Sequence, residues 1–279
     1  MAPPNTGSCT LRDRRAGRVN EGGLPTIAKF LTSRVIMNII RFLTVGLISS
    51  SFVLCKAQSD ATNGTFTDFE GNVYTTTRIG NQIWTVENLR STKFADGKSI
   101  PLVTDSAKWF SASSAAYCWY DNNAGKSNGN GALYNWHAVN GGKLAPKGWR
   151  VPTDSDWSTM EAYLIANGHN WDGSKEGNKI AKSLAARTAW KTDPTPGAIG
   201  NNISVNNRSG FSALPGGCRQ SDGSFQRNGD FASWWSATQF DTLLAWSRNL
   251  GYDQVELSRM NDNYTTCGFS VRLVRDYAP

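Results

Sequence analysis

The sequence predicts a loop-rich α+β domain. Three observations lead to this class: short runs of alternating polarity interrupted by Gly, Asn and Asp, one segment with a clear helix start signal, and a composition with 27 Gly and 11 Trp but only 18% charged residues. So few charges argue against a disordered chain and against a charge-rich helical bundle. With 39% hydrophobic residues among 279, the chain has enough apolar material for a substantial core.

The first 57 residues are expected to lie outside this domain. Residues 1–36 are interpreted as an upstream extension. Residues 37–57 are interpreted as an export signal, because Arg41 precedes an apolar run from Phe42 to Leu54 and a small-x-small cleavage site at Cys55–Ala57. That run has 13 residues, which is short for a membrane span. We therefore expect a secreted, periplasmic or cell-surface protein without a stable transmembrane anchor, with a retained anchor as the alternative.

The formal charge of +7 comes almost entirely from this leader. Residues 1–57 hold eight Lys and Arg against two Asp and Glu, which leaves 21 against 20 in residues 58–279. A nearly neutral domain offers no basic stripe to a phosphate backbone, so no nucleic-acid partner is expected.

The folded domain is expected to span residues 68–277, after a short polar tether over residues 58–67. It opens with a hairpin, because residues 72–79 and 82–86 alternate in polarity and Gly80-Asn81 suits the turn between them. Residues 90–130 show weak periodicity and predict loops. Their stretch Asp121–Asn130 is rich in oxygen ligands, so a structural calcium ion stays open, while no other cofactor is expected.

The clearest predicted helix covers residues 153–168. Thr153 can cap its N-terminus, and Asp156 stands three residues on as in a capping box. Its apolar face is expected to consist of Trp157, Met160, Ala162, Tyr163 and Leu164. Shorter helices are expected over residues 133–139 and 176–186.

The final quarter of the chain is expected to be all β. Two Gly-Phe-Ser signatures, at Gly210 and Gly268, bracket short alternating runs, and Trp234 and Trp235 are expected in the core. Within it, residues 246–266 mix aromatic side chains with Ser, Asn and Asp, which is the composition of binding surfaces. The candidate ligand-binding residues are Trp246, Ser247, Tyr252, Asp253, Glu256, Ser258, Met260, Asn261, Asp262, Asn263, Tyr264 and Thr265. The alternative is that the large residues are core and the polar ones face water.

The sequence shows no signature of a catalytic site. It has no Gly-x-Ser-x-Gly elbow and no His-Glu-x-x-His pair, and a structural role is expected for His137 and His169. Asp154, Asp156 and Glu161 fall in one predicted helix, where capping and solvation explain them. Glycosidase chemistry stays an alternative, since two carboxylates that meet in space leave no sequence signature.

Three cysteines remain once the leader is set aside. Cys118 lies among Tyr and Trp residues and is expected in the core. Cys218 and Cys267 lie on the two Gly-Phe-Ser segments, where they either form a disulfide, as an oxidising compartment would permit, or stay buried as thiols.

A series of short motifs resembles the Fibrobacter succinogenes major paralogous domain, which is found in exported bacterial proteins. The motifs occur in order at Asp68–Tyr74, Ile79–Trp84, Glu87–Leu89, Tyr117–Asn122, Leu133–Trp136, Gly148–Thr153, Gly210–Gly217, Trp234–Ser236, Arg248–Leu250 and Gly268–Arg272. Each motif alone is weak, whereas the ordered series is specific.

The resemblance extends to the C-type lectin-like fold in its formylglycine-generating-enzyme variant. It implies a compact α+β domain with two helices and a twisted, mostly antiparallel sheet. The same fold serves the target proteins of diversity-generating retroelements, in which a varied segment before a terminal Gly-Phe-x-Val-Arg-like strand binds the ligand. Residues 246–266 hold that position here.

Two departures from related proteins limit this resemblance. The Glu-Pro-Asn triplet and Trp-Asn-Asp run of calcium-type sugar-binding lectins are missing, and only Cys218 and Cys267 could imitate the copper-binding cysteines of the formylglycine-generating enzyme. The expected function is therefore a non-enzymatic binding module, which presents residues 246–266 to a protein or glycan on a cell, phage or host surface. The alternatives are a carbohydrate-active or formylglycine-generating-type enzyme and a structural component of a surface layer.

Overall fold

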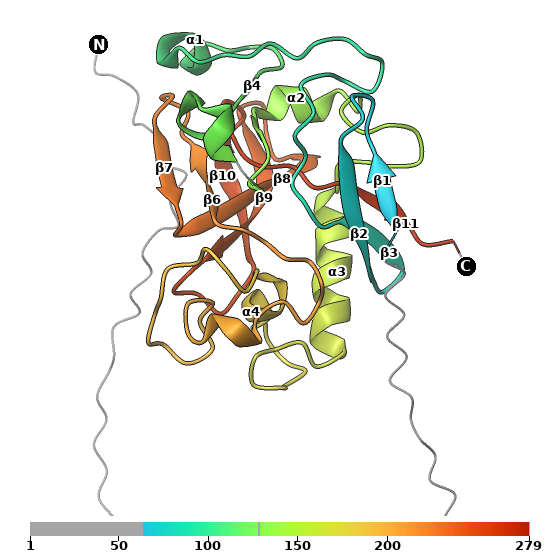
Figure 1. Cartoon of the computed structure of the whole chain (residues 1–279), viewed down its shortest axis with the longest axis vertical. Helices are drawn as coiled ribbons and strands as arrows, with labels where there is room; N and C mark the ends of the chain where they lie inside the picture. Colours follow the sequence, from blue (N-terminus) through green and yellow to red (C-terminus); the bar gives the residue numbers. More distant parts are fainter. Residues whose placement is uncertain (1–63, 128, 279) are drawn as a thin grey trace, which may run out of the picture. The chain divides into compact units, whose positions relative to one another are not determined.

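The structure, a computed structural model, describes residues 64–127 and 129–278. The predicted extension, export signal and first part of the tether, residues 1–63, lie outside the described residues. The described residues form an α+β fold of mostly antiparallel sheets and short helices (Figure 1). The strands are β1 (Thr65–Thr67), β2 (Val73–Ile79), β3 (Gln82–Thr85), β4 (Tyr117–Cys118), β5 (Leu133–Tyr134), β6 (Gly216–Arg219), β7 (Phe225–Asn228), β8 (Phe231–Gln239), β9 (Leu244–Gly251), β10 (Ser258–Tyr264) and β11 (Val274–Asp276). The helices are α1 (Ser106–Phe110), α2 (Trp136–Asn140), α3 (Asp154–Ala166) and α4 (Ala181–Leu184).

The strands form two larger sheets and one short two-stranded ladder. A four-stranded sheet has the order β1-β2-β3-β11, so the last strand pairs with the N-terminal hairpin. A five-stranded sheet has the order β10-β9-β8-β6-β7, with one parallel contact between β6 and β8. The described ladders between the other strands are antiparallel, including the small β4-β5 pair.

The N-terminal hairpin is confirmed, and the fold begins earlier than predicted. Strands β2 and β3 pair with the expected turn, where Gly80 has a φ of +62°. Residues Thr65–Thr67, predicted as tether, instead form β1 on the edge of this sheet, because Phe66 is buried against Tyr74 and Trp149.

Helix α3 confirms the predicted helix and its capping box. Thr153 accepts from the backbone N–H of Asp156, and the Asp156 side chain accepts from the backbone N–H of Thr153. Of the predicted apolar face, Trp157, Met160 and Leu164 are buried, whereas Ala162 and Tyr163 are exposed. The helix contacts β2 as well as β8 and β9, so it joins the two larger sheets.

The two shorter predicted helices differ from the observed ones. The helix expected over residues 133–139 begins at Trp136, because Asn135 caps it and the preceding Leu133–Tyr134 pairs as β5. The helix expected over residues 176–186 is reduced to α4. Its first part instead forms a loop around the side chain of Asn170, which donates to the carbonyls of Glu176 and Gly177.

Aromatic side chains form the core, which divides into clusters on either side of the five-stranded sheet. Neighbouring strand residues Trp234 and Trp235 are both fully buried, and they belong to different clusters, as alternation along β8 requires. Trp234 packs with Trp157 and Phe211, whereas Trp235 packs on Phe269 with ring centroids 4.3 Å apart. The expected core role of both tryptophans is confirmed.

A buried hydrogen-bond network links motifs that lie far apart in the sequence. The side-chain oxygen of Asn88 accepts from Trp234 Nε1 at 2.9 Å and from Arg272 Nε at 2.7 Å. Its amide donates to Ser270 Oγ at 3.1 Å. The guanidinium of Arg272 also donates to the carbonyl of Phe211, so four of the sequence motifs meet around one asparagine.

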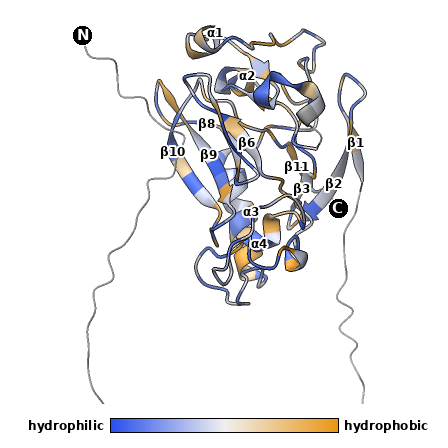
Figure 2. Ribbon diagram, turned by 60° about the vertical axis from the view of Figure 1, so that its left-hand side comes forward, coloured by the Kyte–Doolittle hydropathy of each residue, from blue (hydrophilic) through white to orange (hydrophobic). Residues whose placement is uncertain are grey.

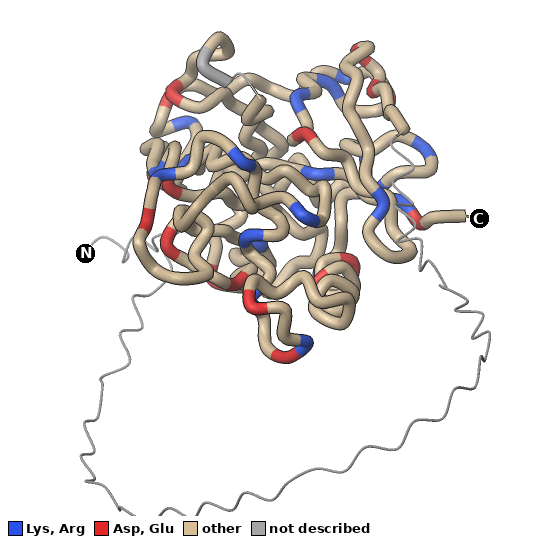
Figure 3. The backbone as a smooth tube through the Cα atoms, turned by 60° about the horizontal axis from the view of Figure 1, so that its bottom comes forward, with Lys and Arg blue, Asp and Glu red and all other residues tan. Residues whose placement is uncertain are grey.

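Charged residues of both signs are interspersed along the described chain (Figure 3). Hydrophilic residues lie on β9 and β10 among the apolar strands (Figure 2). These two strands contain most of the predicted binding segment.

Candidate functional site: the β9-β10 hairpin

The predicted binding segment forms a hairpin at the edge of the five-stranded sheet. Strand β9 pairs with both β8 and β10, whereas β10 is the edge strand. The register of β10 shifts between Met260 and Asn263, so Asn261 and Asp262 form an irregularity in the edge. Such bulges protect an edge strand from unspecific pairing and redirect side chains toward solvent.

Four of the predicted ligand-binding residues are buried, and this part of the prediction is corrected. Ser247, Ser258, Asn263 and Thr265 are each less than 7% exposed. Side chains alternate along a strand, so the hairpin turns these polar groups into the domain. There Asn263 Nδ2 donates to Ser247 Oγ at 3.0 Å, which ties β10 to β9.

The other predicted residues lie at the surface to different degrees. Tyr252 and Tyr264 are partly buried and pack against the two large core clusters. The ammonium of Lys191 lies over the ring of Tyr252. The remaining members are exposed or half-buried, and they are Trp246, Asp253, Glu256, Met260, Asn261 and Asp262.

Trp246 is the centre of an aromatic and cationic cluster on this hairpin. Its ring meets that of Phe240 edge to face, with centroids 5.5 Å apart, and Phe240 is 48% exposed. The guanidinium of Arg259 lies 3.6 Å from the centroid of the Trp246 ring. We call Phe240, Trp246 and Arg259 the Trp246 cluster. Sequence analysis missed Phe240 and Arg259, since contacts between neighbouring strands depend on the register.

Asp154, the first residue of α3, holds the cluster in place. Its carboxylate accepts from Arg259 Nη2 at 2.7 Å and from Arg248 Nη1 at 2.6 Å. The side chain of Arg248 is fully buried, and it also donates to Ser158 Oγ at 3.2 Å. Burial raises the pKa of Asp154, but the hydrogen bonds from Arg259 and Arg248 outweigh it and leave the pKa below its usual value.

Of the three helix carboxylates that left glycosidase chemistry open, Asp154 and Asp156 pair with arginines, whereas Glu161 accepts from Asn178. Asp156 binds Arg150 through two hydrogen bonds of 2.6 and 3.0 Å. Burial alone would raise the pKa of Asp156. The hydrogen bonds from Arg150 and Thr153 lower it by more, so the net pKa lies below its usual value. The pKa of Glu161 is raised by burial. Asp154 and Asp156 are therefore held ionised by arginines, which suits a structural role.

Of the two alternatives left open for Cys218, the structure shows the buried thiol: Cys218 is free and is not bonded to Cys267. Cys118 is also free and fully buried, which confirms its place in the core. Burial raises the pKa of both thiols to about 12. A thiol with such a pKa carries little thiolate at neutral pH and is a poor nucleophile and metal ligand.

The folded protein is therefore expected to protect Cys118 and Cys218 from alkylation. Peptide mass spectrometry after iodoacetamide treatment should show both labelled at least about a hundredfold more slowly than in the urea-unfolded chain, because the reagent needs an accessible thiolate. Equal labelling of Cys218 in the folded and unfolded chain would contradict its burial.

Residues 64–127 and 129–278 bring together no group of three His, Cys, Asp or Glu side chains that could hold a metal ion. In the same residues, no helix has the length and apolar character needed to cross a membrane.

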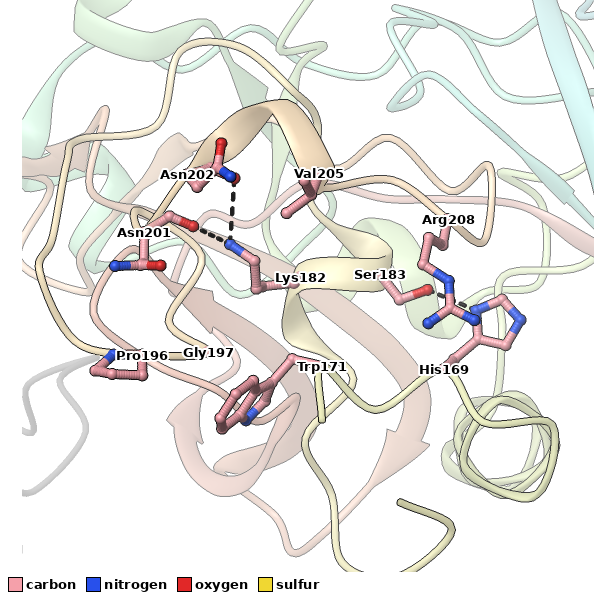
Figure 4. Close-up of a pocket in the computed structure, with 10 residues that line it drawn as sticks. All are labelled: His169, Trp171, Lys182, Ser183, Pro196, Gly197, Asn201, Asn202, Val205 and Arg208. Atoms are coloured by element: carbon pink, nitrogen blue, oxygen red, sulfur yellow. Dashed lines mark hydrogen bonds between the residues drawn. The ribbon is translucent and has the colours of Figure 1, made fainter. Parts of the chain in front are cut away.

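A pocket of about 300 Å³ is lined by none of the predicted ligand-binding residues (Figure 4). Its lining comes from the loop after α3, from α4 and from the loops around residues 196–208, and it comprises His169, Trp171, Lys182, Ser183, Pro196, Gly197, Asn201, Asn202, Val205 and Arg208. His169 Nδ1 lies 2.6 Å from Ser183 Oγ, which supports the structural role expected for this histidine. No motif marks the pocket in the sequence, because it is assembled from separate loops.

Comparison with protein families identifies the family of this chain. A family model, the Fibrobacter succinogenes major domain, matches residues 77–275, which include the Asn88 network, the Trp246 cluster and the pocket. No curated protein and no solved structure matches the chain. Since the match covers more than half of the sequence, the chain belongs to the Fibrobacter succinogenes major domain family.

Proposed function

We propose that this protein is an exported, non-enzymatic binding module that recognises a protein or glycan on a cell, phage or host surface through its β9-β10 hairpin. The observation that carries the proposal is the Trp246 cluster, an aromatic pair at the surface with an arginine fixed over it. Trp and Arg are the residues most enriched among those that dominate binding energy at interfaces.

The cluster is organised before any ligand arrives. Arg259 makes three contacts shorter than 3.3 Å to Asp154, and Asp154 is itself held by the buried Arg248. A side chain that is already fixed loses little conformational entropy on binding, so more of its contact energy appears as affinity. Leu243 adds apolar surface in the turn between β8 and β9, where it is 61% exposed.

Around this centre, short polar side chains offer adaptable hydrogen bonds. Asn261 and Asp262 lie at the irregularity of β10, and Asp253 and Glu256 lie in the loop that joins β9 to β10. Aromatic anchors with Asn, Asp and Ser at their rim are typical of recognition surfaces. The proposed contact surface is accordingly narrower than residues 246–266, and it omits the four buried members.

The family resemblance supports two finer parts of the proposal. We infer that the domain is a C-type lectin-like scaffold of the formylglycine-generating-enzyme type, with β11 closing the sheet that the N-terminal hairpin begins. We further infer that residues 246–266 hold the position varied in retroelement target proteins. A near-identical copy of their codons beside a reverse transcriptase gene would support the second inference, and flanking DNA without such a copy would oppose it.

Loss of the Trp246 indole is expected to remove ligand binding without unfolding the domain. Wild-type protein is screened on a glycan array and against a phage-displayed peptide library, and each ligand found is titrated with the variants. Trp246→Ala and Arg259→Ala should each lower affinity at least about tenfold, since truncating a central hot-spot residue costs about 2 kcal/mol or more.

Phe110→Ala is the matched control, because Phe110 is 57% exposed on α1, away from the hairpin. It should leave affinity unchanged. Melting temperatures are measured for all variants, so that a folding defect is recognised. A ligand that binds wild-type and Trp246→Ala protein equally well would exclude the Trp246 cluster as its contact surface.

A further inference from the structure

The pocket beside α4 is lined by cationic side chains without an acidic counterpart. Its ionisable lining residues are His169, Lys182 and Arg208, and no Asp or Glu lines it. Burial and the nearby charge of Arg208 lower the pKa of His169, so the imidazole is neutral at neutral pH. Lys182 and Arg208 then give the pocket a net positive charge, which favours an anionic ligand.

The two cations have different roles. Lys182 is only 8% exposed, and its ammonium donates to the backbone carbonyl of Ala198. It also donates to the carbonyls of Asn201 and Asn202 (Figure 4). Three carbonyl acceptors occupy its three donors, so Lys182 fixes the loop and contributes charge. Arg208 is exposed and gives one hydrogen bond, from Nη1 to the carbonyl of Gly168 at 3.1 Å. Its remaining N–H groups have no protein acceptor within residues 64–127 and 129–278, so they can receive a carboxylate or sulfate.

His169 is placed to add a second donor beside Arg208. Figure 4 shows the imidazole and the guanidinium close together at one end of the pocket. If the hydroxyl of Ser183 donates to Nδ1, the proton of the neutral ring lies on Nε2. An anion in the pocket would favour this tautomer, because Nε2 then presents an N–H to the anion instead of a lone pair.

Trp171 forms an apolar wall of the same pocket. The indole is 44% exposed, and it lies so close to Gly197 that a Cβ there would be 2.3 Å from the ring. Gly197 has a φ of +83°, which other residues rarely adopt, and a side chain at this position would collide with the indole. Glycine is therefore required for Trp171 to pack here. A fixed, exposed aromatic face beside a few polar groups is typical of small-ligand pockets, and the volume corresponds to a ligand about the size of a monosaccharide.

We propose that this pocket binds an acidic sugar, whose ring packs on Trp171 while its carboxylate or sulfate is held by Arg208 and His169. The site is separate from the Trp246 cluster and does not depend on the function proposed for it. The shared ligand chemistry is a sugar ring with a negative charge, which a uronic acid or a sulfated sugar would supply.

The test is a calorimetric and NMR titration of the full chain with sodium glucuronate, sodium galacturonate and glucose 6-sulfate. Glucose serves as the uncharged ring, and sodium acetate and sodium sulfate serve as anions without a ring. At least one acidic sugar should bind about tenfold or more tightly than glucose, because only the acidic sugar can accept a charge-assisted hydrogen bond from Arg208 through a carboxylate or sulfate. Acetate and sulfate should also bind more weakly than that sugar, since they leave Trp171 uncovered.

Two variants test which residue contacts which part of the ligand. Arg208→Gln should remove the preference for the acidic sugar over glucose, whereas Trp171→Ala should weaken the binding of the acidic sugar and of glucose alike. Lys147→Gln is the control, because Lys147 is exposed and does not line the pocket; it should change nothing. The proposal is overturned if none of the three acidic sugars binds, if sulfate binds as tightly as they do, or if Arg208→Gln retains the preference. Trp246→Ala should bind the sugar normally, so failure here is distinguishable from failure of the hairpin surface.

Discussion

Asp154→Ala is expected to destabilise the domain by about 3–5 kcal/mol, because it leaves the fully buried guanidinium of Arg248 without its carboxylate. The cost exceeds that of a surface ion pair, since a buried charge without a partner keeps its desolvation penalty. Urea unfolding followed by tryptophan fluorescence measures the loss. The same substitution frees Arg259, so it should also weaken any ligand of the Trp246 cluster.

Two further variants separate this explanation from a general helix defect. Thr159→Ala changes an exposed residue of α3 and should alter stability by less than about 0.5 kcal/mol. The double variant Asp154→Ala/Arg248→Met removes both charges, and it should regain part of the lost stability because an apolar side chain needs no counter-charge. A double variant no more stable than Asp154→Ala would contradict the explanation.

The stability difference between wild type and Asp154→Ala is also expected to depend on pH. The pKa of Asp154 is lower in the folded than in the unfolded state, where it is about 3.9, so its contribution is fully present above that value. The contribution is lost as the pH falls through the lowered folded pKa. Unfolding curves measured from pH 7 down to pH 2 should therefore converge at the acidic end.

Arg272→Met is the second substitution with a large expected effect, a loss of roughly 3 kcal/mol or more. The guanidinium is 1% exposed and donates to Asn88 Oδ1, the carbonyl of Thr85 and the carbonyl of Phe211 at 2.7 to 2.9 Å. Methionine fills similar space but removes this donor from the carbonyls of Thr85 and Phe211, at a cost of about 1–3 kcal/mol each, whereas Asn88 Oδ1 keeps its hydrogen bond from Trp234. Thermal and urea unfolding measure the change.

Arg275→Met provides the matched control three residues along the chain. Arg275 is partly exposed, and its guanidinium lies 5.5 Å from the ring of Trp149. Its loss should cost no more than about 1 kcal/mol. Comparable destabilisation by both substitutions would show that the Asn88 network is not what Arg272 supports.

The parts of the fold that sequence analysis predicted are those with local signals. Alternation and the Gly80 turn predicted β2 and β3, and the capping box predicted α3. The helix expected over residues 176–186 was overestimated, because residues 176–179 loop around the buried side chain of Asn170, which lies six to nine residues earlier in the chain. Asn178 also donates to the carbonyl of Leu257, and such a long-range contact leaves no periodic trace in the sequence.

For the candidate site, composition located the segment but could not orient its side chains. The burial of Ser247 and Asn263 follows from the register between β9 and β10, and that register contains an irregularity that no local pattern reveals. Phe240 and Arg259 join Trp246 for the same reason. The acidic-sugar pocket was missed because Trp171 and Arg208 come from two loops and Lys182 from the short helix α4, and none of the three belongs to a recognisable motif.

The pairing of β3 with β11 also sets the order of events when the chain is made. Strand β3 cannot pair with β11 until residues 274–276 have been synthesised. Asn88 likewise cannot accept from Arg272 until that residue has been added to the chain. A contact between such distant parts carries a large loop-closure cost and slows folding. A ribosome-bound chain therefore stays incompletely folded until residues 272–276 have emerged, and domains whose contacts are local would already be folded at that stage.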